Sequence, residues 1–323
     1  MISTEELLII HVLPENTSPC GGIKVHYDLS EIEKKLGIES IICFPNVNSI
    51  PHWMAKRDTG RITSYKEAQQ YAYTSKKSGK KVVVIGWEDT YPLDSMFNDF
   101  IKVCYIQGHV FWNPILNNYR DKHILCISEF VRKFILREDA HVVEPFIRKD
   151  IFYPMNFNLK FFANRCNVLI QKRKNGDKVR EDLINILYSS NKYSPTLLRR
   201  VQFYTLEDVS EIAFAHVLRE HDVFIAHSYP EGFGLPALEA MASNTFVIGF
   251  TGGGGEEFMK DGQNCFVVKD GDLNALADSL YNFLLLDNQK LEVLIRNAYN
   301  TSLKYTKENT TQQYLRFLER VVG

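Results

Sequence analysis

The sequence has no apolar run long enough to cross a membrane. Its longest apolar stretches, such as residues 82–85 and 283–286, are far shorter than the roughly 20 residues that a spanning helix needs. The first residues carry acidic side chains where a secretory signal peptide carries basic ones, so residues 7–13 are expected to form a buried strand. We therefore expect a cytoplasmic protein.

A surplus of charge of one sign is also absent. The chain has 38 basic and 39 acidic residues and a net charge of −1, without a long run of either sign, so a nucleic-acid partner is not expected. Its six cysteines are scattered, with no CxxC pair and no histidine at metal-ligand spacing. They are expected to be small core residues in a reducing compartment.

Short β-branched runs alternate with helical patterns along the chain, which at 323 residues is longer than one core usually fills. Runs that are apolar throughout and separated by helices predict parallel sheets covered on both faces. The runs lie at residues 7–13, 40–44, 81–87, 102–107, 123–128 and 141–146, and then at 167–171, 201–205, 222–227, 245–250 and 265–268.

Between these two groups, residues 149–165 have no clean period and form the candidate linker. We predict an α/β fold of two doubly wound, Rossmann-like domains that face a cleft, over residues 1–154 and 155–305. Residues 306–323 are expected to form a closing amphipathic helix that packs back on the first domain.

The most informative segment is SYPEGFGLPALEAMASNTFVIGFTGGGGEE, residues 228–257, directly after a predicted strand. Two glycines permit a tight turn, and Pro236 stands at the expected first position of a helix. The N–H groups of Phe233, Gly234 and Leu235 would then point at an anion. A diphosphate there is stabilised by hydrogen bonds and by the helix dipole.

Two carboxylates accompany this turn. Glu231 and Glu239, eight positions apart within EGFGLPALEAMA, resemble the paired-glutamate signature of family 4 glycosyltransferases and their relatives of the two-domain GT-B type. In that family the second glutamate, here Glu239, binds the donor ribose, and the first, here Glu231, contacts the donor sugar. The alternative is an ordinary helix start with solvated acids.

The resemblance extends to two further places. Arg173 and Lys178 follow the strand at 167–171 and match the arginine and lysine with which the family holds the donor diphosphate. Such cations stabilise charge that develops on the leaving group, although most basic surface runs are merely solvated. Gly21 and Gly22 match the Gly-Gly that opens the family's first helix, where donor or acceptor approaches the backbone. An ordinary glycine turn is the alternative.

In the first half of the chain, His109 is the candidate for touching the transferred sugar, because family members often present a histidine there. Phe111 and Trp112 beside it either stack on an acceptor or pack the domain. Residues 145–154 resemble the family's domain-crossing segment without its Asn-Gly. Residues 251–257 resemble its glycine-containing turn before a glutamate, with four consecutive glycines instead of a mixed segment.

The resemblance implies a retaining, metal-independent hexosyl- or deoxyhexosyltransferase without a cofactor. It would transfer a sugar from a nucleotide diphosphate donor to a hydroxyl of a glycan, a lipid-linked molecule or a small molecule. The only Asp-x-Asp run, Asp270-Gly271-Asp272, stands at a predicted helix start, where capping explains it. Charge neutralisation would fall to Arg173, Lys178 and helix N–H groups.

Two rival interpretations stay open. The same fold serves a nucleotide-sugar epimerase and phosphorylases, and a catalytically silent GT-B subunit could bind a nucleotide sugar or a partner enzyme. Peripheral contact with the inner face of a membrane is compatible with lipid-linked acceptors, although no strongly basic amphipathic helix stands out.

Overall fold

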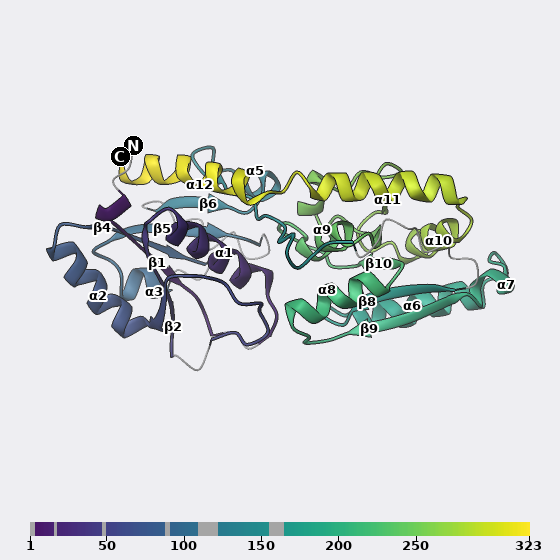
Figure 1. Cartoon of the computed structure of the whole chain (residues 1–323). Coiled ribbons are helices and arrows are strands. Elements are labelled where there is room, and N and C mark those ends of the chain that lie inside the picture. Colours follow the sequence, from purple (N-terminus) through teal and green to yellow (C-terminus); the bar gives the residue numbers. More distant parts are fainter. Residues whose placement is uncertain (1–3, 16–17, 47–49, 88–90, 109–121, 155–164) are drawn as a thin grey trace. The chain divides into compact units, whose positions relative to one another are not determined.

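The computed structural model describes residues 4–15, 18–46, 50–87, 91–108, 122–154 and 165–323. The chain divides into two compact units, coloured by sequence in Figure 1. Unit 1 comprises Met1–Pro145 together with Lys307–Gly323, and unit 2 comprises Phe146–Thr306. Three residues considered above, His109, Phe111 and Trp112, lie outside the described residues.

Unit 1 is built on a parallel seven-stranded sheet of order β3-β2-β1-β4-β5-β6-β7. The strands are β1 Leu7–Val12, β2 Glu39–Phe44, β3 Arg61–Ser64, β4 Lys81–Gly86, β5 Ile101–Ile106, β6 His123–Cys126 and β7 His141–Val142. The order reverses between β1 and β4, as in dinucleotide-binding Rossmann domains. The central strands are buried along nearly their whole length, which explains their continuous apolar runs.

The helices of unit 1 include the C-terminal one, drawn in yellow in Figure 1. They are η1 Thr4–Glu6, α1 Gly21–Lys35, α2 Tyr65–Lys77, α3 Tyr91–Ser95, α5 Glu129–Phe134 and α12 Lys307–Val322. Helix α12 is fixed to α1 through the fully buried Tyr314, whose hydroxyl donates to the Glu33 carboxylate. The predicted closing helix is therefore present and belongs to unit 1.

Glu33 is also the centre of a buried polar network. His11 Nε2 lies 3.0 Å from both of its carboxylate oxygens, and His11 Nδ1 lies 2.9 Å from Nδ1 of His26. All three side chains are fully buried. Burial, and secondarily the neighbouring His11, lowers the pKa of His26 well below its ordinary value. The network thus connects β1 to α1 through Glu33, the same residue that binds Tyr314 of α12.

Unit 2 is built on a parallel five-stranded sheet of order β12-β11-β10-β8-β9. The strands are β8 Cys166–Gln171, β9 Val201–Leu206, β10 Val223–Ala226, β11 Phe246–Gly249 and β12 Phe266–Val267. Numbered within the unit, this is the flavodoxin-like order 2-1-3-4-5, and it reverses between β8 and β10. Ligands of such sheets bind beyond the carboxyl ends of the strands at the reversal.

Helices cover this sheet around a core that includes Val168, Ile225, Ile248 and Leu280. They are α6 Gly176–Ser189, α7 Pro195–Leu198, α8 Glu211–Glu220, α9 Leu235–Ala242, η4 Gly254–Glu257, α10 Leu273–Leu284 and α11 Asn288–Ser302. Asp272 caps α10 by accepting from the N–H of Ala275 at 2.9 Å, which confirms the capping role predicted for it.

The predicted α/β class is confirmed, and each apolar run corresponds to a strand. Strand β3 was missed because RITS is a short, mostly polar edge strand that lacks the apolar signal. The predicted boundary lay after residue 154, whereas residues 146–154 belong to unit 2. Ile147 donates to the carbonyl of Tyr305 at 3.0 Å, and Phe152 packs against Phe214 with ring centroids 6.3 Å apart.

Five cysteines are buried as predicted, and Cys20 is partly exposed. Within the described ranges, no helix combines the length and the apolar character that crossing a bilayer would require.

Candidate functional site

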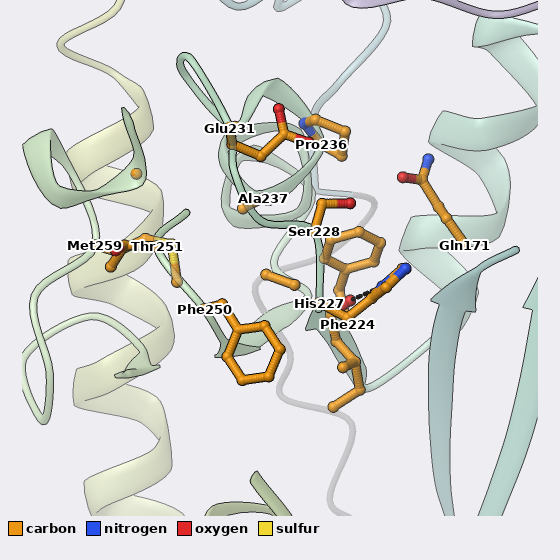
Figure 2. A pocket seen from close by; sticks show the side chains of 14 residues that line it. Gln171, Phe224, His227, Ser228, Glu231, Pro236, Ala237, Phe250, Thr251 and Met259 are labelled. Carbon is orange, nitrogen blue, oxygen red and sulfur yellow. Dashed lines mark hydrogen bonds between the residues drawn. The ribbon is translucent and has the colours of Figure 1, made fainter. Parts of the chain in front are cut away.

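A pocket opens in unit 2 where the strand order reverses. Its empty volume is about 360 Å³, which includes space open to solvent. Its walls come from the ends of β8, β10 and β11 and from the start of α9. Figure 2 shows Gln171 and Ser228 on one side of it and Thr251 and Met259 on the other. The lining residues are Gln171, Phe224, Ile225, Ala226, His227, Ser228, Glu231, Gly234, Pro236, Ala237, Phe250, Thr251, Gly255 and Met259.

The start of α9 forms one wall of this pocket. Gly234 precedes the helix with φ 90° and ψ 40°, a left-handed conformation that favours glycine. Pro236 is the second helical residue, one position later than predicted. Phe233 is buried against Phe258 and Tyr305, with ring centroids 5.6 Å away in both cases. The turn is thus anchored in the core. The N–H of Leu235 precedes the first hydrogen bonds of α9, which run from Ala237 and Leu238 to the carbonyl of Gly234 at 3.1 and 3.4 Å.

The two glutamates of the signature differ in exposure. The Glu231 side chain is 27% exposed at the pocket, whereas Glu239 lies one turn inside α9 and is only 4% exposed. The backbone of Glu231 is held on both sides, because its N–H donates to Gly252 at 2.8 Å and its carbonyl accepts from Gly254 at 3.0 Å. Its carboxylate therefore projects from a fixed point of the backbone.

The turn with four consecutive glycines makes these two backbone hydrogen bonds of Glu231 possible. A Cβ atom on Gly254 would lie 2.2 Å from the carbonyl oxygen of Gly232, so only glycine allows the two turns to approach. Gly252 has a φ of 60° and donates its N–H to Asp270 at 3.2 Å. Close backbone contact at Gly254 and a positive φ angle at Gly252 therefore explain why glycine stands at these two positions.

The turn after β8 adjoins this pocket next to Gln171 and His227, which line it. Its residues Lys174 and Asn175 have positive φ angles of 53° and 68°. The imidazole of His227 donates from Nε2 to the carbonyl of Arg173 at 2.9 Å. The ammonium of Lys174 lies 2.5 Å from Oε1 of Glu231 and 3.3 Å from the carbonyl of Pro230. The two turns at the strand-order reversal are therefore joined by side chains from both.

Of the two cations predicted here, Arg173 lies in this turn and Lys178 on the first turn of α6. The Lys178 side chain is 75% exposed and lies 3.3 Å from Asp182, one helical turn further along. Lys174, which the sequence analysis did not single out, is the cation that contacts Glu231. Its residue type gave no signal, because the direction of its side chain depends on the positive φ angles of this turn.

In unit 1, Gly21 and Gly22 form the first turn of α1. A Cβ atom on Gly22 would lie 2.6 Å from Oε1 of Gln107 and 2.7 Å from the ring of Trp87. Internal packing at the β1–β4 reversal therefore supplies a reason for this glycine apart from any ligand. Among the residues with described positions, no group of three or more His, Cys, Asp or Glu could hold a metal ion.

These features agree with comparisons to solved structures. A glycosyltransferase of Rickettsia africae has a TM-score of 0.73 at 18% identity, over 98% of this chain and 99% of that one. The HepE protein of Anabaena, crystallised with UDP and glucose, has a TM-score of 0.69 at 16% identity, over 97% and 99%. The protein has the two-domain GT-B fold of glycosyltransferases.

Sequence comparisons find similarity to glycosyltransferases over parts of the chain. Residues 196–301, which contain the α9 turn and both glutamates, match the family described as glycosyl transferases group 1. An uncharacterized glycosyltransferase of Methanocaldococcus jannaschii is 26% identical over 63% of this chain and 60% of its own length. The D-inositol 3-phosphate glycosyltransferase of Mycobacterium tuberculosis is 31% identical over 38% of this chain and 26% of its own length. The matched region therefore spans less than two thirds of these relatives.

Proposed function

We propose that the protein is a retaining glycosyltransferase that takes a sugar from a nucleoside diphosphate donor held by unit 2. The observation that carries this proposal is the arrangement at the β8–β10 reversal. There the Glu231 carboxylate contacts Lys174 of the turn after β8, close to the start of α9, and Glu239 lies one turn inside that helix. Unit 1 would supply the acceptor side. Its Gly21 and Gly22 would let the donor phosphates approach the backbone, and His109 would contact the transferred sugar.

Each part has a chemical task in this proposal. The N–H groups of Phe233, Gly234 and Leu235 at the start of α9 would bind the diphosphate, helped by the helix dipole. Arg173 and Lys178 would stabilise the charge that grows on the diphosphate as the glycosidic bond breaks. Glu239 would accept hydrogen bonds from the ribose hydroxyls and Glu231 from the donor sugar. An acceptor hydroxyl would attack on the face from which the diphosphate departs, without a metal ion.

The donor and acceptor classes follow from the same reasoning. Because HepE was crystallised with UDP and glucose, UDP-hexoses are the first donors to test. A glycan, lipid-linked or small-molecule hydroxyl is the proposed acceptor class, and inositol phosphates join the acceptor panel because a relative is named for one. The proposed location is the cytoplasm, with peripheral contact to a membrane where the acceptor is lipid-linked.

The test is a calorimetric screen of UDP, GDP and ADP and their sugars, first in EDTA and then with magnesium. Metal-independent binding of one nucleotide, weakened at least severalfold in Glu239→Gln, supports the donor site. A transfer assay with the bound sugar nucleotide then tests turnover, and product with retained anomeric configuration supports the proposed reaction. Binding without transfer to any acceptor in the panel would instead support a catalytically silent subunit.

A further inference from the structure

The ion pair between Lys174 and Glu231 joins the turn after β8 to a residue that lines the pocket. Nζ of Lys174 lies 2.5 Å from Oε1 of Glu231, and it also donates to the carbonyl of Pro230 at 3.3 Å. Because the Glu231 backbone is held by Gly252 and Gly254, the remaining freedom of this residue is in its side chain. Within the part of the chain that the structure describes, Lys174 is the side chain that contacts this carboxylate.

Stability of the fold does not explain this contact. The Lys174 side chain is 46% exposed, and an ion pair with so much solvent around it contributes little to stability. The turn that presents it contains two consecutive non-glycine residues at positive φ, which is an unfavourable backbone conformation. Backbone strain of this kind is found mainly where a site needs a particular geometry.

The negative charge of Glu231 explains why a cation is needed next to this carboxylate. A carboxylate at the mouth of a site that receives a diphosphate repels its ligand, because like charges a few ångströms apart interact strongly even near the surface. An ammonium bound directly to that carboxylate cancels the repulsion. It also leaves the second carboxylate oxygen available to hydroxyl groups of a sugar.

We propose that Lys174 is a positioning residue of the donor site, which orients the Glu231 carboxylate and neutralises it toward an anionic donor. This inference rests on the proposed function, since it concerns the same site. It assigns to Lys174 a role distinct from those of Arg173 and Lys178, because Lys174 acts through Glu231 and not on the diphosphate itself.

The neighbouring lysine Lys172 provides a matched control. It belongs to the same turn, but its ammonium lies 2.8 Å from Glu207 and 3.7 Å from Asp177, away from Glu231. Lys172→Met therefore removes one positive charge from the turn without changing the Glu231 ion pair. Lys174→Arg keeps the charge and tests whether a cation alone is sufficient.

The experiment is a double-mutant cycle of Lys174→Met and Glu231→Gln, read by calorimetric dissociation constants for UDP, GDP and ADP in metal-free buffer. We expect Lys174→Met to weaken binding about three- to tenfold when Glu231 is present and to have little effect in the Glu231→Gln background. The loss should shrink at high salt, since both side chains are partly exposed. Lys174→Arg should recover most of the affinity, and Lys172→Met should stay near wild type.

An equal loss in both backgrounds would show that Lys174 acts directly on the nucleotide and would overturn the positioning role. An unchanged affinity in Lys174→Met would overturn it as well. The thermal midpoint of each variant shows that the fold is intact. If the wild-type protein binds none of the three nucleotides, the proposed function fails and the positioning role fails with it, whereas binding without coupling rejects the positioning role alone.

Discussion

The imidazole of His227 donates from Nε2 to the main-chain carbonyl of Arg173, 2.9 Å away. His227 follows β10 and Arg173 follows β8, so this bond joins the two strands whose reversal creates the pocket. Because a carbonyl can only accept, Nε2 carries a proton in this contact, and Nδ1 lies 3.4 Å from a second carbonyl, that of Ile225. His227 is buried and fixes the backbone of the turn that bears Arg173 and Lys174.

We expect His227→Phe to weaken nucleotide binding severalfold and to lower the free energy of unfolding by about 1 kcal/mol, because the Arg173 carbonyl loses the imidazole and keeps the N–H of Gly176, 3.3 Å away, as a donor. His227→Gln keeps an N–H near the position of Nε2 and should retain most of the affinity. Calorimetric dissociation constants and chemical denaturation measure both effects. Equal losses in the two variants would show that the hydrogen bond is not what holds the turn.

Adjacent glycines of the glycine-rich turn should respond differently to the same substitution. In Gly254→Ala the new Cβ would lie 2.2 Å from a main-chain carbonyl oxygen, whereas in Gly255→Ala it would lie 3.0 Å from the flexible Met259 side chain. We expect Gly254→Ala to destabilise unit 2 by about 2–3 kcal/mol and Gly255→Ala by less than about 1 kcal/mol. Thermal and denaturant unfolding measure the loss of stability in each variant. Similar losses in both would mean that the two turns can move apart with little loss of free energy.

Replacement of the two predicted diphosphate cations tests their part in the chemical step. If Arg173 and Lys178 act on charge that grows during bond cleavage, Arg173→Met and Lys178→Met should lower kcat by about tenfold or more and the donor affinity less. The measurement is steady-state transfer kinetics together with donor binding. Parallel losses in kcat/KM and in donor affinity, with kcat unchanged, would mean that they bind the ground state and the transition state equally.

The sequence predicted the strands of both sheets because nearly all are apolar throughout, and it predicted the α9 turn because glycine and proline mark such turns. It missed β3 because an edge strand such as RITS carries no continuous apolar run. It also missed Lys174, since a positive φ angle at a lysine is not encoded by residue type. The need for glycine at Gly254 became visible only once two turns far apart in sequence were seen to touch.

The buried histidine of unit 1 makes stability depend on pH. Burial holds the pKa of His26 well below its ordinary value. Below about pH 6.5, His26 is therefore protonated in the unfolded chain but stays neutral in the folded chain. Stability should therefore fall as the pH is lowered through this window, by at most about 1.4 kcal/mol per pH unit for this group. Denaturant unfolding between pH 5 and pH 8 measures the slope.

The variant His26→Phe should unfold with a smaller slope than wild type, and His52→Gln, an exposed histidine of the same unit, serves as the matched control. Part of the slope should remain, because partial burial also lowers the pKa of His123 and His141. An unchanged slope in His26→Phe would mean that His26 is protonated in the folded protein.

Because α12 belongs to unit 1 but follows unit 2 in the chain, the two units are completed in a particular order during translation. Residues 146–306 are complete, with all the strands of unit 2, before the helix that carries Tyr314 has been synthesised. Domains fold as units when their residues become available, usually in the order in which they are made. Here unit 1 begins before unit 2 and is completed after it, because Glu33 receives its tyrosine donor only after α12 has been translated.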